Sequence, residues 1–130
     1  MNPSRELDAL VAEKVMGYRA AEVTAHACGP WGEDVQYKTQ GWVYDGKDFS
    51  FLPEFSTDIT AAWQVVEKLR GRFLFQLFTT GEPGDEFACE FYTKVIVNSG
   101  HRRGDTFHHY SESAPHAISL AALKAVGHEF

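Results

Sequence analysis

The chain has few cysteines, no long apolar run and a deficit of basic residues. Only two cysteines, Cys28 and Cys89, occur in 130 residues, far apart and outside any Cys-x-x-Cys pair. They do not provide the disulfide framework of a small secreted protein, so we expect two buried, reduced thiols rather than a disulfide. No stretch approaches the ~20 apolar residues of a membrane span, and no apolar leader is evident. We therefore expect a cytoplasmic protein without a membrane partner.

The charge of the chain is unfavourable for nucleic-acid binding. Its 18 acidic and 12 basic residues give a formal charge of −6. Sequence-independent binding to DNA or RNA depends on the neutralisation of phosphates by Lys and Arg, and an acidic chain without a basic stripe does this poorly. Nucleotide-binding loops of the GxGxxG and GxxxxGK[ST] types are also absent. A small anionic ligand in a local basic pocket remains compatible with this charge.

The sequence contains no local pattern of an enzyme or a metal site. A GxSxG motif is absent, and neither cysteine lies at an electropositive helix start. His26 and Cys28 would share one strand face, whereas the adjacent His108 and His109 would point to opposite faces. These residues do not supply the four local N or S ligands of structural zinc. We therefore expect no catalytic residue, no cofactor and no metal.

Three segments carry apolar residues at helical spacing. Asn2 is the expected cap of the first, and Ser56 or Thr57 the expected cap of the second. The buried stripe expected on the second helix consists of Ile59, Ala62, Trp63, Val66 and Leu69. The three predicted helices span residues 3–17, 56–71 and 115–126.

Alternating apolar and polar residues predict strands between and after these helices. Residues 72–80 are apolar on both faces, which predicts a central strand covered on both sides. Residues 101–105 are predicted to form a polar loop. The other predicted strands span residues 21–28, 35–38, 41–44, 86–92, 95–97 and 107–110. We expect one domain over residues 1–130, of the α/β (α+β) class, with a mainly antiparallel sheet sandwiched by three helices in α-β-α layers.

The three helical segments together resemble the phage ABA sandwich domain family of small bacteriophage and prophage proteins. They read LDALVAEKVMG (residues 7–17), FSTDITAAWQVVEKL (55–69) and APHAISLAALKA (114–125). The resemblance implies a sheet between helical layers, a phage protein in the bacterial host cytoplasm, and no assigned reaction. The chain departs from the family in two places. Tyr18 follows the Met-Gly pair where the family often has Trp, and the stretch between the first two helices is longer.

The densest basic segment is the candidate ligand site. Arg102 and Arg103 follow His101, and His108 is close behind. Guanidinium groups bind phosphate in bidentate fashion, although a solvated loop explains the same residues. The start of the second helix offers free N–H groups, and nearby aromatic rings could stack on a base. The candidate ligand-binding residues are His101, Arg102, Arg103, His108, Tyr18, Trp31, Phe55, Ser56 and Thr57.

Two hypotheses of different classes follow. The first is a non-enzymatic phage protein that sequesters a small phosphate-bearing ligand, such as a nucleotide signal of host immunity, as an anti-defence protein. The alternative is a protein-interaction module that inhibits a host or phage protein, with Trp31 and Tyr44 as anchors. A small hydrolase is a third interpretation. A homo-oligomer could form through the alanine-rich face of the last helix, around Ala121 and Ala122.

Overall fold

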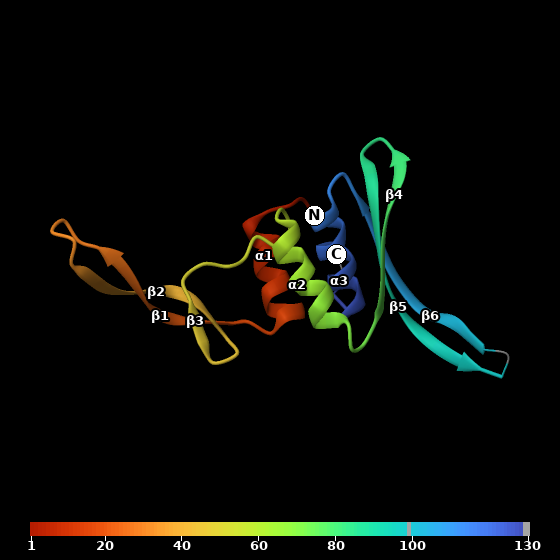
Figure 1. Cartoon of the computed structure of the whole chain (residues 1–130), viewed down its shortest axis with the longest axis horizontal. Helices are drawn as coiled ribbons and strands as arrows, with labels where there is room; N and C mark the ends of the chain where they lie inside the picture. Colours follow the sequence, from red (N-terminus) through yellow and green to blue (C-terminus); the bar gives the residue numbers. More distant parts are fainter. Residues whose placement is uncertain (99, 129–130) are drawn as a thin grey trace. The chain divides into compact units, whose positions relative to one another are not determined.

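Within residues 1–98 and 100–128, which the structure describes, a computed structural model contains three α-helices and two antiparallel three-stranded sheets (Figure 1). The α+β prediction is therefore confirmed. The side chains of Ile96, His101 and Arg102 lie outside the described set. The chain divides into a helical unit, Met1–Met16 with Pro53–Phe130, and a hairpin unit, Gly17–Leu52. One domain over residues 1–130 stays a prediction.

The first helix combines an α segment with a π segment. α1 spans Arg5–Val11 and the π-helix η1 spans Ala12–Met16. Ser4, not Asn2, caps α1, because its hydroxyl accepts the N–H of Leu7 at 3.1 Å. The buried residues recur as adjacent pairs every fourth position, namely Leu7, Asp8, Val11, Ala12, Val15 and Met16. An α-helix alone would rotate this stripe, and the wider π turn keeps it on one face.

α2 spans Ile59–Leu69 and begins later than predicted. Its cap is Asp58, whose carboxylate accepts the N–H of Thr60 at 3.1 Å. The predicted stripe is partly wrong, because Ile59 and Trp63 are exposed. The residues that α2 buries are Ala61, Ala62, Val65, Val66 and Leu69.

α3 spans Ala114–Ala125 and lies between the other helices and a sheet (Figure 1). Ser113 caps it, and Pro115 occupies its first turn, where a missing N–H costs little. The predicted apolar face is confirmed as buried, including Ala121 and Ala122. Because this face packs within its own chain, it is not open to a second copy.

The sheet of the helical unit consists of β4 (Leu74–Glu82), β5 (Asp85–Val97) and β6 (Gly100–Ser111), in the order β4-β5-β6. The prediction of a central strand at residues 72–80 is wrong, because tight hairpins on both sides of β5 place β5 in the middle. The predicted polar loop at residues 101–105 is also wrong, since these residues belong to β6. The backbone of residues 101–103 pairs with residues 94–96 of β5.

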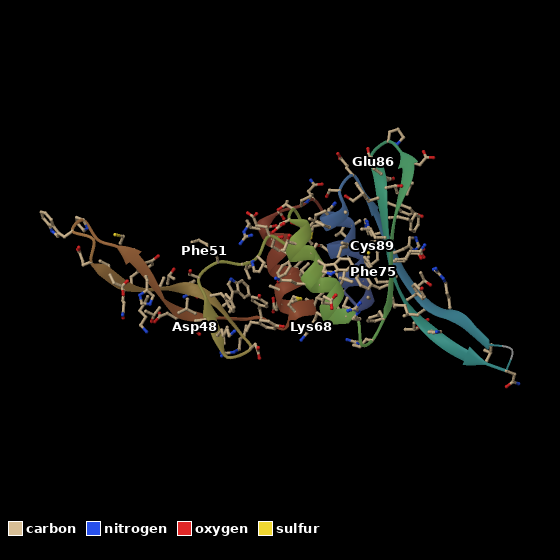
Figure 2. The ribbon with its side chains drawn as sticks, viewed as in Figure 1. Asp48, Phe51, Lys68, Phe75, Glu86 and Cys89 are labelled. Carbon is tan, nitrogen blue, oxygen red and sulfur yellow. The ribbon has the colours of Figure 1, made fainter. Side chains whose placement is uncertain are left out.

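An aromatic core lies on the sheet face that packs against the helices. Phe73 meets Phe107 edge to face at 5.9 Å between ring centroids, and Trp63 of α2 meets Phe75 at 5.7 Å. Phe75 and Cys89 lie on this side of the sheet (Figure 2). Burial raises the pKa of the Cys89 thiol. Cys28 is exposed, so the prediction of two buried thiols is wrong for Cys28, while both are free.

The hairpin unit is a sheet of β1 (Arg19–Cys28), β2 (Asp34–Tyr44) and β3 (Lys47–Phe49), in the order β1-β2-β3. The two short strands predicted within residues 35–44 are one continuous strand. The turn between β2 and β3 uses Asp45 and Gly46, both at positive φ, as a two-residue hairpin requires.

The hairpin unit buries few side chains. The ring of Tyr18 stacks on Tyr44 with 4.4 Å between centroids, and Val23 and Ala25 are buried. Burial raises the pKa of Tyr18, and the neighbouring Tyr44 adds to this effect. No helix among the described residues is long and apolar enough to cross a membrane.

Candidate functional site

The face of the β4–β6 sheet that points away from the helices carries an exposed set of polar and aromatic side chains. Residues directly opposite each other in antiparallel strands point to the same face, so the register assigns its members. We call this set the outer sheet face; it consists of Leu74, Gln76, Phe78, Ala88, Glu90, Tyr92, Lys94, Arg103, Thr106, His108 and Tyr110.

Arg103 is held in place on this face by three neighbours. Its guanidinium donates to Glu90 at 2.6 Å and to Gln76 Oε1 at 2.8 Å, and it lies 4.2 Å above the ring centroid of Tyr92. The hydrogen bond to Glu90 raises the pKa of Arg103. Arg103 is therefore fixed in one geometry, and its charge is already paired.

The other end of the outer sheet face is apolar. Phe78, Ala88 and Tyr110 lie opposite one another across the three strands. The small Ala88 leaves room for the two aromatic rings beside it, which remain 37% and 45% exposed. His108 meets Tyr110 edge to face at 5.6 Å. This end offers aromatic surface to a partner at little conformational cost, because aromatic side chains have few rotatable bonds.

Side chains from the same chain bind two backbone carbonyl groups of β6. Lys124 Nζ donates to the carbonyl oxygen of His108 at 3.1 Å, and His109 Nδ1 donates to that of Tyr110 at 2.9 Å. Burial lowers the pKa of His109, and the nearby Lys124 adds to this effect. These carbonyl groups are already occupied, so the outer sheet face rather than this strand edge is available for binding.

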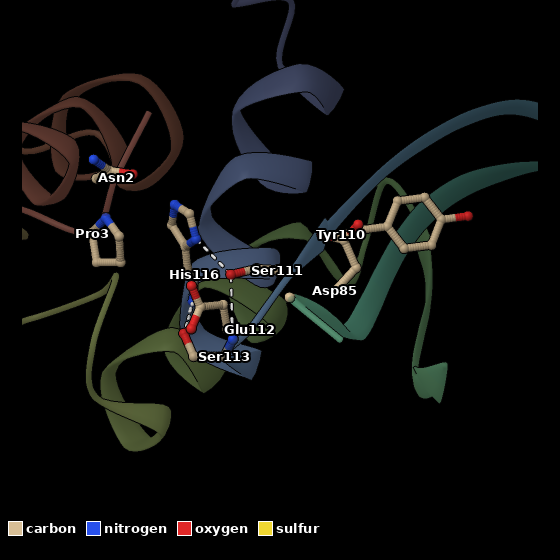
Figure 3. A pocket seen from close by; sticks show the side chains of 9 residues that line it. Asn2, Pro3, Asp85, Tyr110, Ser111, Glu112, Ser113 and His116 are labelled. Carbon is tan, nitrogen blue, oxygen red and sulfur yellow. Dashed lines mark hydrogen bonds between the residues drawn. The ribbon is translucent and has the colours of Figure 1, made fainter. Parts of the chain in front are cut away.

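A cavity of about 370 Å³ opens at the start of α3 (Figure 3). The carbonyl oxygen of Met1 can only accept, so His116 Nε2–H donates to it at 2.6 Å. In the neutral imidazole, Nδ1 then accepts the hydroxyl proton of Ser111 at 2.6 Å. This is the proton geometry of a nucleophile and its base, but Ser111 is buried and the network joins Met1 to α3. We therefore assign the network to the anchoring of the first residues.

The cavity is unsuited to an anion. Its described lining carries the carboxylates of Asp85 and Glu112 and includes no lysine or arginine. At the start of α3, the N–H groups of His116 and Ala117 already donate to Ser113. A phosphate would meet like charge at this helix end, where these two N–H groups already have acceptors. The charge of the chain left open a local basic pocket for a small anionic ligand, and this cavity is not such a pocket.

The structure brings together only part of the predicted ligand site. Arg103 and His108 share the outer sheet face, and Glu90 lies between them as the cross-strand neighbour of His108. The side chains of His101 and Arg102 lie outside the described set. Tyr18 and Trp31 belong to the hairpin unit, where Tyr18 is buried and Trp31 lies in the turn between β1 and β2.

The residues predicted at the start of the second helix have structural roles. Phe55 and Ser56 are fully buried. Ser56 donates its N–H and its hydroxyl to one carboxylate oxygen of Asp8, at 2.8 and 2.7 Å, and Ser119 Oγ donates to the Phe55 carbonyl at 3.0 Å. Phe55 has no surface on which a base could stack, while Thr57 is exposed.

The residues that hold Arg103 were missed by the sequence analysis. The alternation of residues 86–92 already places Glu90 on the outward face, but the register that brings Gln76 and Arg103 to it comes from strand pairing. Within residues 1–98 and 100–128, no group of three or more His, Cys, Asp or Glu is placed to hold a metal ion.

The fold is similar to that of a solved phage protein. The crystal structure of a phage protein from Bacillus cereus ATCC 14579 matches with a TM-score of 0.59 and 25% sequence identity, over 95% of this chain and 90% of that one. No curated protein matches the sequence. The model of the phage ABA sandwich domain matches residues 9–123. The chain therefore belongs to the phage ABA sandwich domain family.

Proposed function

We propose that the chain is a non-enzymatic interaction module of a bacteriophage, which binds a protein partner through the outer sheet face. The observation that supports this most is Arg103, held on Tyr92 by Glu90, on the same sheet face as the exposed rings of Phe78 and Tyr110. Arginine and aromatic residues contribute most of the binding energy at protein interfaces. A side chain that is already ordered loses little further entropy when it binds.

The charge on this face indicates the chemistry of the partner. Arg103 and Glu90 neutralise each other in place, and the exposed Lys94 lies opposite Arg103. The exposed rings of Phe78 and Tyr110 lie at the other end of the face. Because the aromatic end is away from Lys94, we propose an apolar protein surface as the partner there.

Sequestration of a phosphate-bearing nucleotide is the second candidate. It is supported by the presence of Arg103 and His108 on one face. A phosphate would have to displace Glu90 from Arg103, and the carboxylate is already within hydrogen-bond distance at 2.6 Å. This competition lowers the affinity for an anion, so the protein-binding function is the better supported of the two.

Site-specific cross-linking tests the proposal. A photo-reactive amino acid in place of Phe78 should cross-link one phage or host protein during infection, whereas the same group in place of the exposed Lys14 should not. The purified partner should bind the wild-type chain, and Tyr110→Ala should weaken binding about 30-fold, the effect of a hot-spot residue worth ~2 kcal/mol. Lys14→Ala is the matched control and should bind normally.

Two results would count against the proposal. Equal cross-linking from positions 78 and 14 would show that the outer sheet face is not the interface. A thermal shift with one nucleotide from a panel, abolished in both Arg103→Ala and His108→Ala, would instead support sequestration of a small ligand. Circular dichroism on each variant separates loss of binding from loss of the fold.

A further inference from the structure

β1 forms an outer edge of the hairpin-unit sheet over its whole length. It pairs with β2 on one side, and among the described residues no strand or side chain hydrogen bonds to the backbone of Arg19–Cys28 on the other side. A strand edge with free N–H and C=O groups is a template for pairing with another chain. The ten residues of this edge are enough for a complete ladder with a second strand.

The edge of β1 lacks the features that usually block such pairing. It contains no proline, no lysine and no bulge within its ladder to β2. By contrast, the carbonyl groups of His108 and Tyr110 on β6 are occupied by side chains of the same chain. The other long edge strand, β4, has only one charged residue, Glu82, and so offers no charge pair to a second β4.

We propose that β1 pairs antiparallel with β1 of a second copy, with Thr24 on the two-fold axis. In this register Glu22 lies opposite the partner's His26. By symmetry, His26 lies opposite the partner's Glu22 on the other side of the axis. Thr24 lies opposite the partner's Thr24. An imidazole beside a carboxylate and a Thr–Thr pair are both favourable cross-strand neighbours, because each can form a hydrogen bond. His26 also binds Asp34 at 3.0 Å in its own chain, so the imidazole would lie between two carboxylates.

The same register matches the apolar face of the strand. Val23 lies opposite the partner's Ala25, and Ala21 opposite the partner's Ala27. These small side chains allow two sheets to continue into one without a steric gap or clash. A shift by two residues, the smallest that keeps the two apolar faces on the same side, places Glu22 opposite the partner's Thr24 or Cys28, so the Glu22–His26 pair selects this register.

The oligomeric state and a symmetric disulfide test the proposal. Light scattering should give twice the chain mass of 14.6 kDa. In a Cys28→Ser background, Thr24→Cys should form a disulfide-linked dimer on mild oxidation, because this position meets itself across the axis. Glu22→Cys in the same background is the matched control: it is exposed on the same face but lies off the axis, so it should stay monomeric on a non-reducing gel. Cys89 is buried and does not interfere.

A charge substitution provides an independent measurement. Glu22→Lys places a cation opposite the partner's His26 at both ends and should raise the dimer Kd about tenfold, equivalent to ~1.4 kcal/mol. A single-chain mass for the wild type at its highest attainable concentration would overturn the proposal. So would a dimer that cross-links through position 22 but not through position 24. Circular dichroism confirms that each variant retains the fold.

Discussion

Removal of the Asp8 carboxylate should destabilise the helical unit more than any surface substitution. Asp8 is buried on α1, and one of its oxygens accepts both the N–H and the hydroxyl of Ser56. Asp8→Ala leaves the N–H of Ser56 buried without this acceptor, while the Ser56 hydroxyl keeps only its longer bond to the Ser4 carbonyl at 3.3 Å. We expect the free energy of unfolding to fall by about 1–3 kcal/mol, the usual cost of leaving a buried donor without its partner. The ion pair with Arg5 adds little, because Arg5 is half exposed.

Asp8→Asn separates the geometry from the charge. Its single carbonyl oxygen can keep both bonds to Ser56, and neutral hydrogen bonds are about half as strong as charge-assisted ones. We therefore expect a loss of about 0.5–1.5 kcal/mol, roughly half that of the alanine variant. The assay is urea unfolding followed by circular dichroism, with Ser56→Ala and the double variant completing a mutant cycle.

A clear outcome would refute this reasoning. If Asp8→Ala unfolds within about 0.5 kcal/mol of the wild type, the change is no larger than that of an ordinary surface substitution. The carboxylate would then not anchor the segment before α2. If Asp8→Ala does not fold at all, Asp8→Asn and Ser56→Ala still give the coupling energy.

Three further predictions concern other parts of the chain. Gly41→Ala should destabilise the hairpin unit by about 1–3 kcal/mol, because an added Cβ would collide with the carbonyl oxygen of Phe49, and thermal unfolding would measure it. Burial lowers the pKa of His109, so as the pH drops below 6.5 the unfolded chain binds a proton before the folded chain does, and the free energy of unfolding should fall. In urea titrations at several pH values, His109→Gln should reduce this fall. An unchanged dependence of the free energy of unfolding on pH would contradict the prediction. A thiol reagent should modify Cys28 in the native protein and Cys89 only after denaturation, and two fast-reacting thiols would contradict the burial of Cys89.

The helices and the family could be read from the sequence because their signals are local. The apolar spacing of α3 and the glycine that ends the first helix depend only on neighbouring residues. Strand order is not local. Residues 72–80 are apolar on both faces, yet Leu74 and Phe78 are exposed on the outer sheet face, because β4 is an edge strand with helices on one side. Leu74 and Phe78 therefore belong to the face that we propose for binding rather than to the core.

The candidate site likewise depends on contacts between residues that lie far apart in the sequence. A cluster of basic residues predicted an anion-binding site around Arg103. The strand register instead places Glu90 and Gln76 within hydrogen-bond distance of its guanidinium. Ser56 looked like a helix cap, but Asp8, 48 residues earlier in the chain, binds its hydroxyl and its N–H. Pairings across the fold decide which polar groups remain available to a ligand, and single-sequence patterns do not contain them.

The π segment at Ala12–Met16 has a consequence for sequence comparison within the family. A π turn accommodates one residue more than an α turn while the chain on either side keeps its direction. A relative whose first helix is α-helical throughout should therefore carry a one-residue gap within this segment when the sequences are aligned. An aligner that moves the gap elsewhere would misplace Val15 and Met16 by one position and assign core residues to the surface.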